Sequence, residues 1–205
     1  MNFKTLPEKF YIRDTISVAK ELPGKILVKK EGKKILSGKI VEVEAYIGDH
    51  DPACHAYKKF TNRNKPMYEA GGTIYVYFVY GNYHCLNFVT NKKGIGDAVL
   101  IRGIEPLEGI DIMKRRRIKA KTIYDLTNGP AKICLAFGID KRYNYKKLYN
   151  GNLILTEGYK EKFKIIKSKR IGINTGKDFN YRFFIKDNPY VTKHEFNKTG
   201  IPINN

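Results

Sequence analysis

Hydrophobic and polar residues alternate with a period of two over much of the chain, a pattern typical of β-strands. The alternation is clearest in two neighbouring segments, 25–30 (KILVKK) and 33–47 (KKILSGKIVEVEAYI). We expect further strands within 72–90, at 98–104 and in three later segments, 152–158, 163–173 and 182–193. The pattern therefore predicts a chain rich in β-sheet.

Helical spacing is confined to three shorter parts of the chain. They are the N-terminal segment through Ala19 and the segments 105–121 and 128–139. In the last of these, Pro130 suits the first helical turn and Gly138 suits the C-terminal stop. Strands and helices do not alternate regularly, so a mixed α/β (α+β) fold is expected rather than a doubly wound one.

Two connections along the chain carry chemical interest. Residues 48–72 show no clear period and predict a long loop with room for one helical turn; a loop of this length in a compact domain is usually functional. Gly81-Asn82, between two aromatic-rich runs, is a hairpin turn signal. A strict two-residue turn would pair Tyr77 with Leu86 and place Asn87 on the opposite face.

The length of 205 residues fits one domain over 1–205, with residues 193–205 expected to form a tail. No apolar run approaches the roughly 20 residues needed to cross a bilayer. The first ten residues, MNFKTLPEKF, have no apolar core of a signal peptide. The expected location is therefore cytoplasmic, without membrane association.

The charge balance is the strongest compositional signal. There are 39 Lys and Arg against 20 Asp and Glu, a net charge of +19. This favours a polyanionic partner, nucleic acid or an anionic membrane surface, although a lysine-rich proteome would also produce it. The 15 Tyr and 11 Phe provide rings for base stacking, and no basic amphipathic helix is evident, so nucleic acid is favoured.

The three cysteines, Cys54, Cys85 and Cys134, are too widely spaced to indicate a disulfide framework. Cys54-His55 and His84-Cys85 are adjacent pairs whose members point to opposite faces of a strand. Each pair could offer only one metal ligand to either side. We expect buried free thiols and no metal site.

The strand at 41–47 raises the question of why carboxylates stand there. Alternation places Val41, Val43, Ala45 and Ile47 on the core face, and Glu42, Glu44 and Tyr46 on the other. That second face is either a solvated edge or the wall of a cleft in which one glutamate acts as a general base. In the run YVYFVY, Tyr75 and Tyr77 share one face, while Tyr80 lies beside the turn. An aromatic residue at a hairpin tip suits insertion between stacked bases.

Six motifs follow one another in the order VEVEAYIGDHDPACHA, TNRNKPMY, GGTIYVYFVYGNYHCLN, AVLIRGIEPLEG, NGPAKICLAFGI and KRIGI. In this order they resemble the alkyladenine (3-methyladenine) DNA glycosylase family, which includes the mammalian enzyme. The resemblance extends over residues 5–193. It implies one domain with a curved, largely antiparallel β-sheet core, surrounding helices and a protruding β-hairpin that enters DNA.

The resemblance also implies roles for individual residues. Glu44 matches the catalytic base that activates water, Arg102 the arginine that helps to place this water, and Ile171 the backbone carbonyl beside it. Tyr46, His55 and Tyr77 match residues that contact the flipped base, and Asn87 the asparagine that screens purines. Tyr80 matches the intercalating residue, and Arg63 and Met67 fall in the segment beside the DNA. Glu42 is expected to make only an ordinary polar contact.

The implied function is that of a monofunctional DNA repair glycosylase. It would flip an alkylated purine out of double-stranded DNA and hydrolyse its N-glycosidic bond, acting as a monomer without metal or cofactor. Two alternatives remain from the residues themselves: a non-catalytic basic nucleic-acid-binding protein, and a hydrolase of free nucleosides. A binding module would need neither Glu44 nor Asn87, and a nucleoside hydrolase would need neither the charge of +19 nor the tip tyrosine.

Overall fold

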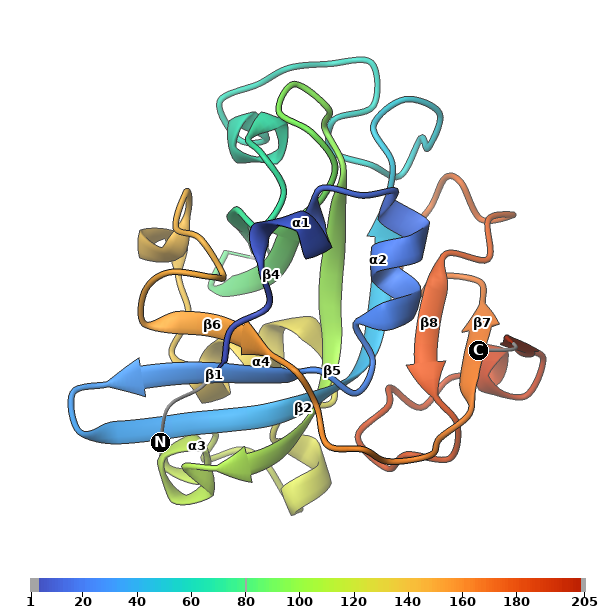
Figure 1. Ribbon diagram of the computed structural model, residues 1–205. Coiled ribbons are helices and arrows are strands. Elements are labelled where there is room, and N and C mark those ends of the chain that lie inside the picture. Colours follow the sequence, from blue (N-terminus) through green and yellow to red (C-terminus); the bar gives the residue numbers. More distant parts are fainter. Residues whose placement is uncertain (1–3, 80, 204–205) are drawn as a thin grey trace.

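A large antiparallel sheet forms the centre of the protein (Figure 1). The computed structural model describes residues 4–79 and 81–203, and in this part the sheet has nine strands. The strand order is β3-β4-β5-β2-β8-β7-β9. Off this path, β1 also pairs with β2, and β6 pairs with β1. The mixed α/β, single-domain, largely antiparallel fold that was expected is confirmed.

The strands are β1 (Ile26–Glu31), β2 (Lys34–Tyr46), β3 (Ile74–Val79), β4 (Tyr83–Val89), β5 (Ala98–Glu108), β6 (Leu153–Thr156), β7 (Ile165–Ser168), β8 (Arg182–Ile185) and β9 (Ile201–Ile203). The α-helices are α1 (Glu8–Tyr11), α2 (Thr15–Glu21), α3 (Ile110–Arg116) and α4 (Pro130–Phe137). Short 3-10 turns are η1 (Lys65–Tyr68), η2 (Ile123–Asp125), η3 (Lys141–Tyr143) and η4 (Glu195–Asn197).

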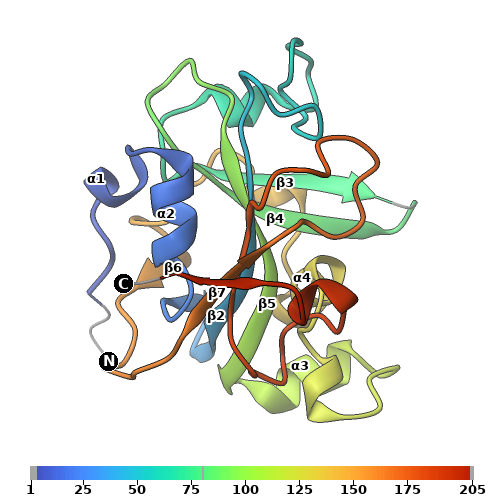
Figure 2. The same cartoon turned by 90° about the vertical axis from the view of Figure 1, so that its right-hand side faces the viewer.

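The helices lie on two sides of the long strands β2 and β5 (Figure 2). Helices α1 and α2 are on one side; α3 and α4 are on the other, where α4 packs on β4 and β5. Pro130 is in the first turn of α4, and Gly138 ends it with a left-handed φ of 62°, as the sequence predicts. None of the described helices is long and apolar enough to cross a bilayer.

Strand β2 carries an irregularity where it pairs with β5. Ile40 pairs with Ile104, Glu42 with Gly103 and Val43 with Ile101, so Val41 is an extra residue on β2 and Arg102 an extra residue on β5. Such bulges change which face a side chain occupies. The expected single face for Val41, Val43 and Ala45 is wrong, because Val41 packs in a separate cluster with Phe184 and Tyr190.

The β3–β4 hairpin projects from the body of the molecule (Figure 2). Val79 pairs with Tyr83, so the connection has three residues, and the strict two-residue turn was wrong. As a result Tyr77 pairs with Cys85 and Tyr75 with Asn87. This register brings Asn87 to the face of the two tyrosines. Tyr80, the predicted intercalating residue, lies outside the described residues.

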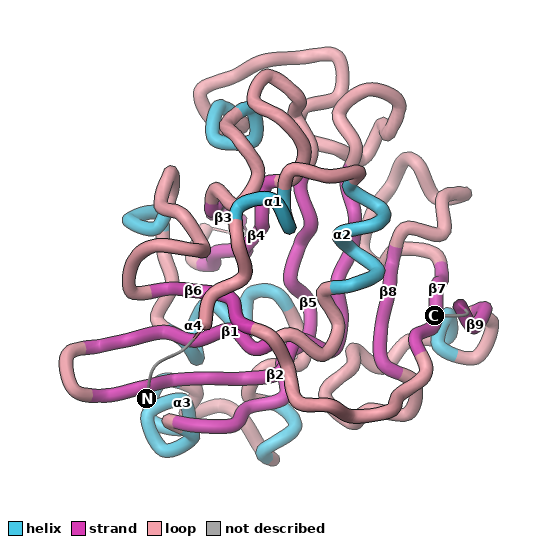
Figure 3. The backbone as a smooth tube through the Cα atoms, viewed as in Figure 1, coloured by secondary structure: helices cyan, strands magenta, loops and turns pink. Residues whose placement is uncertain are grey.

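Three other segments test the expected element boundaries. Residues 48–72 form a loop containing the single turn η1, as expected (Figure 3). Residues 105–108 continue β5 instead of starting a helix, and α3 begins only at Ile110. The expectation of a C-terminal tail is wrong for 195–203, because η4 lies there and β9 pairs with β7.

Candidate active site

A pocket of about 460 Å³ opens between the β3–β4 hairpin, the loop 48–72 and the loop that follows β7. Its lining includes eight of the ten predicted site residues: Tyr46, His55, Arg63, Met67, Tyr77, Asn87, Arg102 and Ile171. Glu44 lies behind three of these, and Tyr80 is outside the described residues. Residues from five separate parts of the chain therefore meet at one place, as the resemblance implied.

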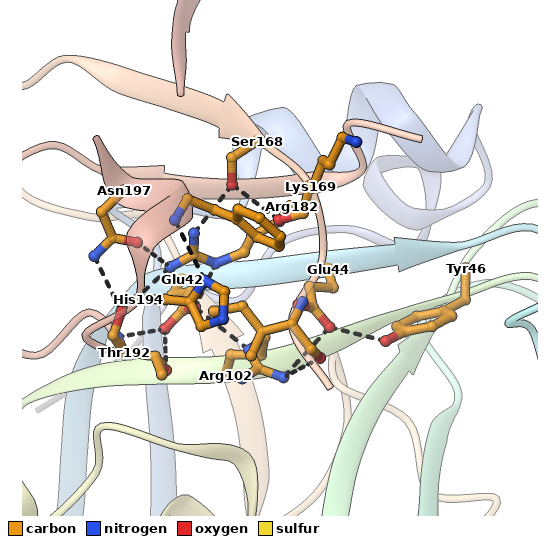
Figure 4. A network of polar contacts seen from close by, with 12 residues as sticks. Glu42, Glu44, Tyr46, Arg102, Ser168, Lys169, Arg182, Thr192, His194 and Asn197 are labelled. Atoms are coloured by element: carbon orange, nitrogen blue, oxygen red, sulfur yellow. Dashed lines mark hydrogen bonds and ion pairs between the residues drawn. The ribbon is translucent and has the colours of Figure 1, made fainter. Parts of the chain in front are cut away.

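Glu44, near the end of β2, is fully buried, and both carboxylate oxygens accept hydrogen bonds. The backbone N–H of Ile171 donates to Oε1 at 2.8 Å. The hydroxyl of Tyr46 donates to Oε2 at 2.8 Å, and Nη1 of Arg102 approaches the same oxygen at 3.4 Å. Figure 4 shows Glu44 between Tyr46 and Arg102. The carboxylate is thus fixed in orientation directly behind the pocket lining.

Arg102 connects the pocket to the buried carboxylates. Its Nε donates to Glu42 at 3.3 Å, and its Nη1 also approaches the carbonyl oxygen of Ile171 at 3.5 Å. Burial disfavours the charged guanidinium, but Glu44 and Glu42 outweigh this and raise the pKa of Arg102. Arg102 is therefore a permanent cation shared between two carboxylates and a carbonyl.

Glu42 is the residue that the sequence interpretation undervalued. Of the two alternatives for this face, the solvated edge is wrong, because Glu42 is completely buried. Nε of Arg182 donates to Oε1 at 2.7 Å, while the N–H and hydroxyl of Thr192 donate to Oε2 at 2.8 and 2.7 Å. Burial opposes ionisation, but Arg102, Arg182 and Thr192 outweigh it and lower the pKa of Glu42 below its ordinary value.

Arg182 extends this network toward the C-terminal segment (Figure 4). Its Nη1 donates to the Ser168 hydroxyl at 3.0 Å and its Nη2 to Oδ1 of Asn197 at 2.9 Å. We call Glu42, Glu44, Arg102 and Arg182 the ionic cluster. No periodicity could have revealed it, because Arg182 is 140 positions from Glu42 in the sequence.

Tyr46 is held from a second side by a buried ion pair. The guanidinium of Arg170 lies 4.6 Å from the centroid of the Tyr46 ring, and it is paired with Asp51 through two hydrogen bonds. Burial first, and then the neighbouring charge of Glu44, raise the pKa of Tyr46 well above its ordinary value. The phenol is accordingly a hydrogen-bond donor to Glu44 at neutral pH.

The opposite side of the pocket is made by His55, Arg63, Tyr75 and Tyr77, which we call the aromatic wall. The His55 ring meets the Tyr77 ring edge to face with centroids 4.5 Å apart, and its Nδ1 is 3.0 Å from the Tyr75 hydroxyl. The guanidinium of Arg63 lies 5.2 Å from the Tyr77 centroid. Burial and the charges of Arg63 and Lys59 lower the pKa of His55 to about 4, so its ring is neutral at pH 7.

Asn87 and Met67 complete the lining. The Asn87 amide nitrogen donates to the carbonyls of Tyr75 at 3.1 Å and Cys85 at 3.3 Å, which fixes the orientation of its side chain. Met67, in η1, is almost fully buried beside it in the lining. Cys54, Cys85 and Cys134 are buried free thiols, as expected. In residues 4–79 and 81–203, no group of three His, Cys, Asp or Glu side chains is placed to hold a metal ion.

Comparison with known proteins points to one family. A methylpurine-DNA glycosylase family profile matches residues 9–189. A Clostridium novyi protein named "Putative 3-methyladenine DNA glycosylase" is 48% identical over 201 residues, covering 93% of this chain and 99% of that protein. Proteins of the same name from Clostridium tetani and Legionella pneumophila are 49% and 44% identical, covering 92% and 93% of this chain and 98% and 99% of their own lengths.

These similarities identify a DNA glycosylase, a hydrolase of DNA repair. The chain belongs to the methylpurine-DNA glycosylase family. This confirms the family that the six sequence motifs indicated.

Proposed function

We propose that this protein flips alkylated and deaminated purines out of duplex DNA. It then hydrolyses the N-glycosidic bond with a water that Glu44 activates, leaving an abasic site. The observation that carries the proposal is the buried Glu44 carboxylate, fixed directly behind the lining of an aromatic pocket. A carboxylate at this position can receive a proton from a water lying between it and the sugar of a base in the pocket.

Counting acceptor positions supports the role of Glu44 as a base. An ionised carboxylate offers about four acceptor positions, and Ile171, Tyr46 and Arg102 use three of them. One position remains for a proton of the water. Among the described residues, the Ile171 carbonyl accepts only the long contact from Arg102, so it can accept the second proton of the same water.

The chemical step follows from these contacts. Glu44 takes one proton, the water oxygen forms a bond to C1′, and the C1′–N bond breaks with its electron pair leaving on the purine. An N3- or N7-alkylated purine is cationic before this step and leaves as a neutral base, so little acid catalysis is needed. Arg102 helps to orient the carboxylate for this proton transfer.

The aromatic residues suit a cationic purine. The rings of Tyr46 and Tyr77 can stack on it, a contribution of about 0.5–2 kcal/mol per contact. His55 is neutral at pH 7 because its pKa is lowered to about 4, so it does not repel the cation. The fixed amide of Asn87 can disfavour guanine, because it would clash with the 2-amino group of that base.

The proposal includes a monofunctional mechanism. A lyase reaction through a Schiff base needs an amine at C1′. The lining of the pocket, within the described residues, contains arginines but no lysine. Water activated by Glu44 is the nucleophile that this lining favours.

DNA binding is assigned to the surplus positive charge and to the hairpin. A charge of +19 neutralises phosphates without reading sequence, and Tyr80 would fill the gap left by a flipped base. Affinity for duplex DNA should therefore fall steeply as salt is raised. A flat response would contradict binding through phosphates.

The main test is base release from duplex oligonucleotides that each carry 3-methyladenine, 7-methylguanine, hypoxanthine or ethenoadenine. The wild-type protein should release at least one of them. Glu44→Gln should lower the single-turnover rate by roughly 10²–10⁴-fold, since it removes the base but keeps the size of the side chain.

Binding to an abasic-site duplex is the control, because it needs no proton transfer and should survive the substitution. Near-normal turnover by the variant would remove Glu44 from the mechanism. A wild-type protein that binds DNA but releases none of the four bases would favour the alternative, a non-catalytic DNA-binding protein.

A further inference from the structure

Glu42 and Glu44 differ in the number of hydrogen-bond acceptor positions that remain free on their carboxylates. Glu42 accepts from Arg182, Arg102 and twice from Thr192, which uses all of its roughly four acceptor positions. Glu44 has one position left. Glu42 therefore has no acceptor position left for a water proton. Its function must lie in the positions of the side chains that donate to it.

The contact with Arg102 is the one that reaches the pocket. Glu42 receives short bonds of 2.7–2.8 Å from Arg182 and Thr192, and so it is firmly anchored. It engages Arg102 through Nε, at the near end of the guanidinium. This leaves Nη1 of Arg102 for Glu44 and for the Ile171 carbonyl.

We propose that Glu42 is a positioning residue, which holds the Nε edge of Arg102 so that Glu44 receives only a single long contact from this arginine and keeps one acceptor position for the water. The inference rests on the proposed function of Glu44. Without Glu42, Arg102 has one carboxylate partner instead of two. It is then free to form the paired, two-bond contact with Glu44 that guanidinium groups prefer.

The formal charge of the ionic cluster makes the proposal testable by pH. Two carboxylates face two guanidinium groups, so the charge is zero, and Glu42→Gln leaves a charge of +1 around Glu44. The other groups near Glu44 are unchanged: Tyr46 on β2, Tyr77 on β3, and Arg170 with its partner Asp51. Extra positive charge keeps a carboxylate ionised to lower pH and makes it a weaker base.

The experiment compares single-turnover base release by wild type and Glu42→Gln from pH 4.5 to 8. We expect the plateau rate to fall by about 100-fold and the acid limb of the profile to move to lower pH. Affinity for an abasic-site duplex should stay within about threefold, because phosphate contacts are untouched. Arg182→Met changes the cluster charge in the opposite direction, so its acid limb should move to higher pH.

Glu31→Gln is the matched control. Glu31 is also paired with two cations, Lys29 and Arg116, but none of the three lines the pocket. Its variant should lose stability without any shift of the acid limb. If Glu42→Gln behaves in the same way, with its rate following only the folded fraction, Glu42 is structural and the proposal is overturned.

Glu42→Asp separates position from charge, and it also decides the matter should Glu42→Gln fail to fold. It keeps the negative charge but withdraws the carboxylate by one methylene group. A reduced rate with an unmoved acid limb supports positioning, and an unchanged rate overturns it. If the wild-type protein itself releases no base, the proposed function fails instead, and the two failures are distinguishable.

Discussion

The two sides of the pocket are built in opposite ways. The ionic cluster is buried, and its anchoring bonds to Glu42 are 2.7–2.8 Å long. The aromatic wall is partly open, and within it Arg63 makes a 3.4 Å contact with His55 and lies above the Tyr77 ring. The first side has one arrangement that satisfies its charges. The second can exchange a partner at little cost, which suits a surface that must admit different damaged bases.

The largest effect should come from breaking the ionic cluster. Arg182→Met leaves Glu42 buried with one of its two cations removed, and this should lower the free energy of unfolding by about 3–5 kcal/mol. Urea denaturation monitored by circular dichroism measures it. Arg142→Met, which breaks the exposed pair with Asp140, is the control and should be nearly neutral. Equal losses in both variants would remove the contrast between buried and exposed pairs.

A smaller effect is expected from the aromatic wall through pH. His55 has a folded-state pKa of about 4 against an ordinary 6.5, so the unfolded chain binds this proton more readily. Stability due to the neutral ring is present above pH 6.5 and is lost as pH falls toward 4. His55→Gln should therefore flatten the pH dependence of stability in this window by about 1–3 kcal/mol.

Urea midpoints at pH 7, 5.5 and 4.5 for both proteins provide the measurement. Other groups titrate in both proteins, so only the difference between the two curves counts. Parallel curves would mean that His55 gains its proton without opening the wall.

The smallest effect concerns Arg63, whose charge lies over the Tyr77 ring where a cationic purine would stack. Arg63→Gln should raise kcat/KM for 3-methyladenine relative to hypoxanthine by roughly two- to fivefold, since a cation at an exposed ring is worth about 0.5–1 kcal/mol. Lys141→Gln removes the same charge from above Phe78, outside the pocket, and should leave the ratio unchanged. An unchanged ratio for Arg63→Gln would show that its contact with Tyr77 is already lost when a base is bound.

The difference between the ionic cluster and the aromatic wall also explains which parts of the site could be predicted from the sequence. The motifs located most residues of the pocket lining, because each motif is one continuous segment of the chain. The strand over 33–47 was also predicted, but the solvated edge, one of the two alternatives for its second face, was not found. Strand β8 pairs beside Glu42, and Thr192 of the C-terminal segment donates to it. The local sequence around Arg182 and Thr192 gives no sign of their role. Only the tertiary fold brings these two residues into contact with Glu42.

The pairing register of the strands was the second feature that the sequence pattern could not predict. The bulges at Val41 and Arg102 each add one residue to a strand, and the connection after Val79 has three residues instead of two. Each of these one-residue differences moves neighbouring side chains to the other face of the sheet. Period-two reasoning cannot detect such insertions. The match of Asn87 to the family was therefore a better guide to its position than the turn signal at Gly81-Asn82.

The late position of Thr192 and Asn197 has a consequence for synthesis on the ribosome. Thr192 is translated 150 residues after its hydrogen-bond partner Glu42. At about 5–20 residues per second, this is a delay of about 8–30 s. For most of that interval Arg102 is the only one of its donors that has been synthesised, so a nascent chain should not acquire a stable catalytic centre until Arg182 and Thr192 have emerged.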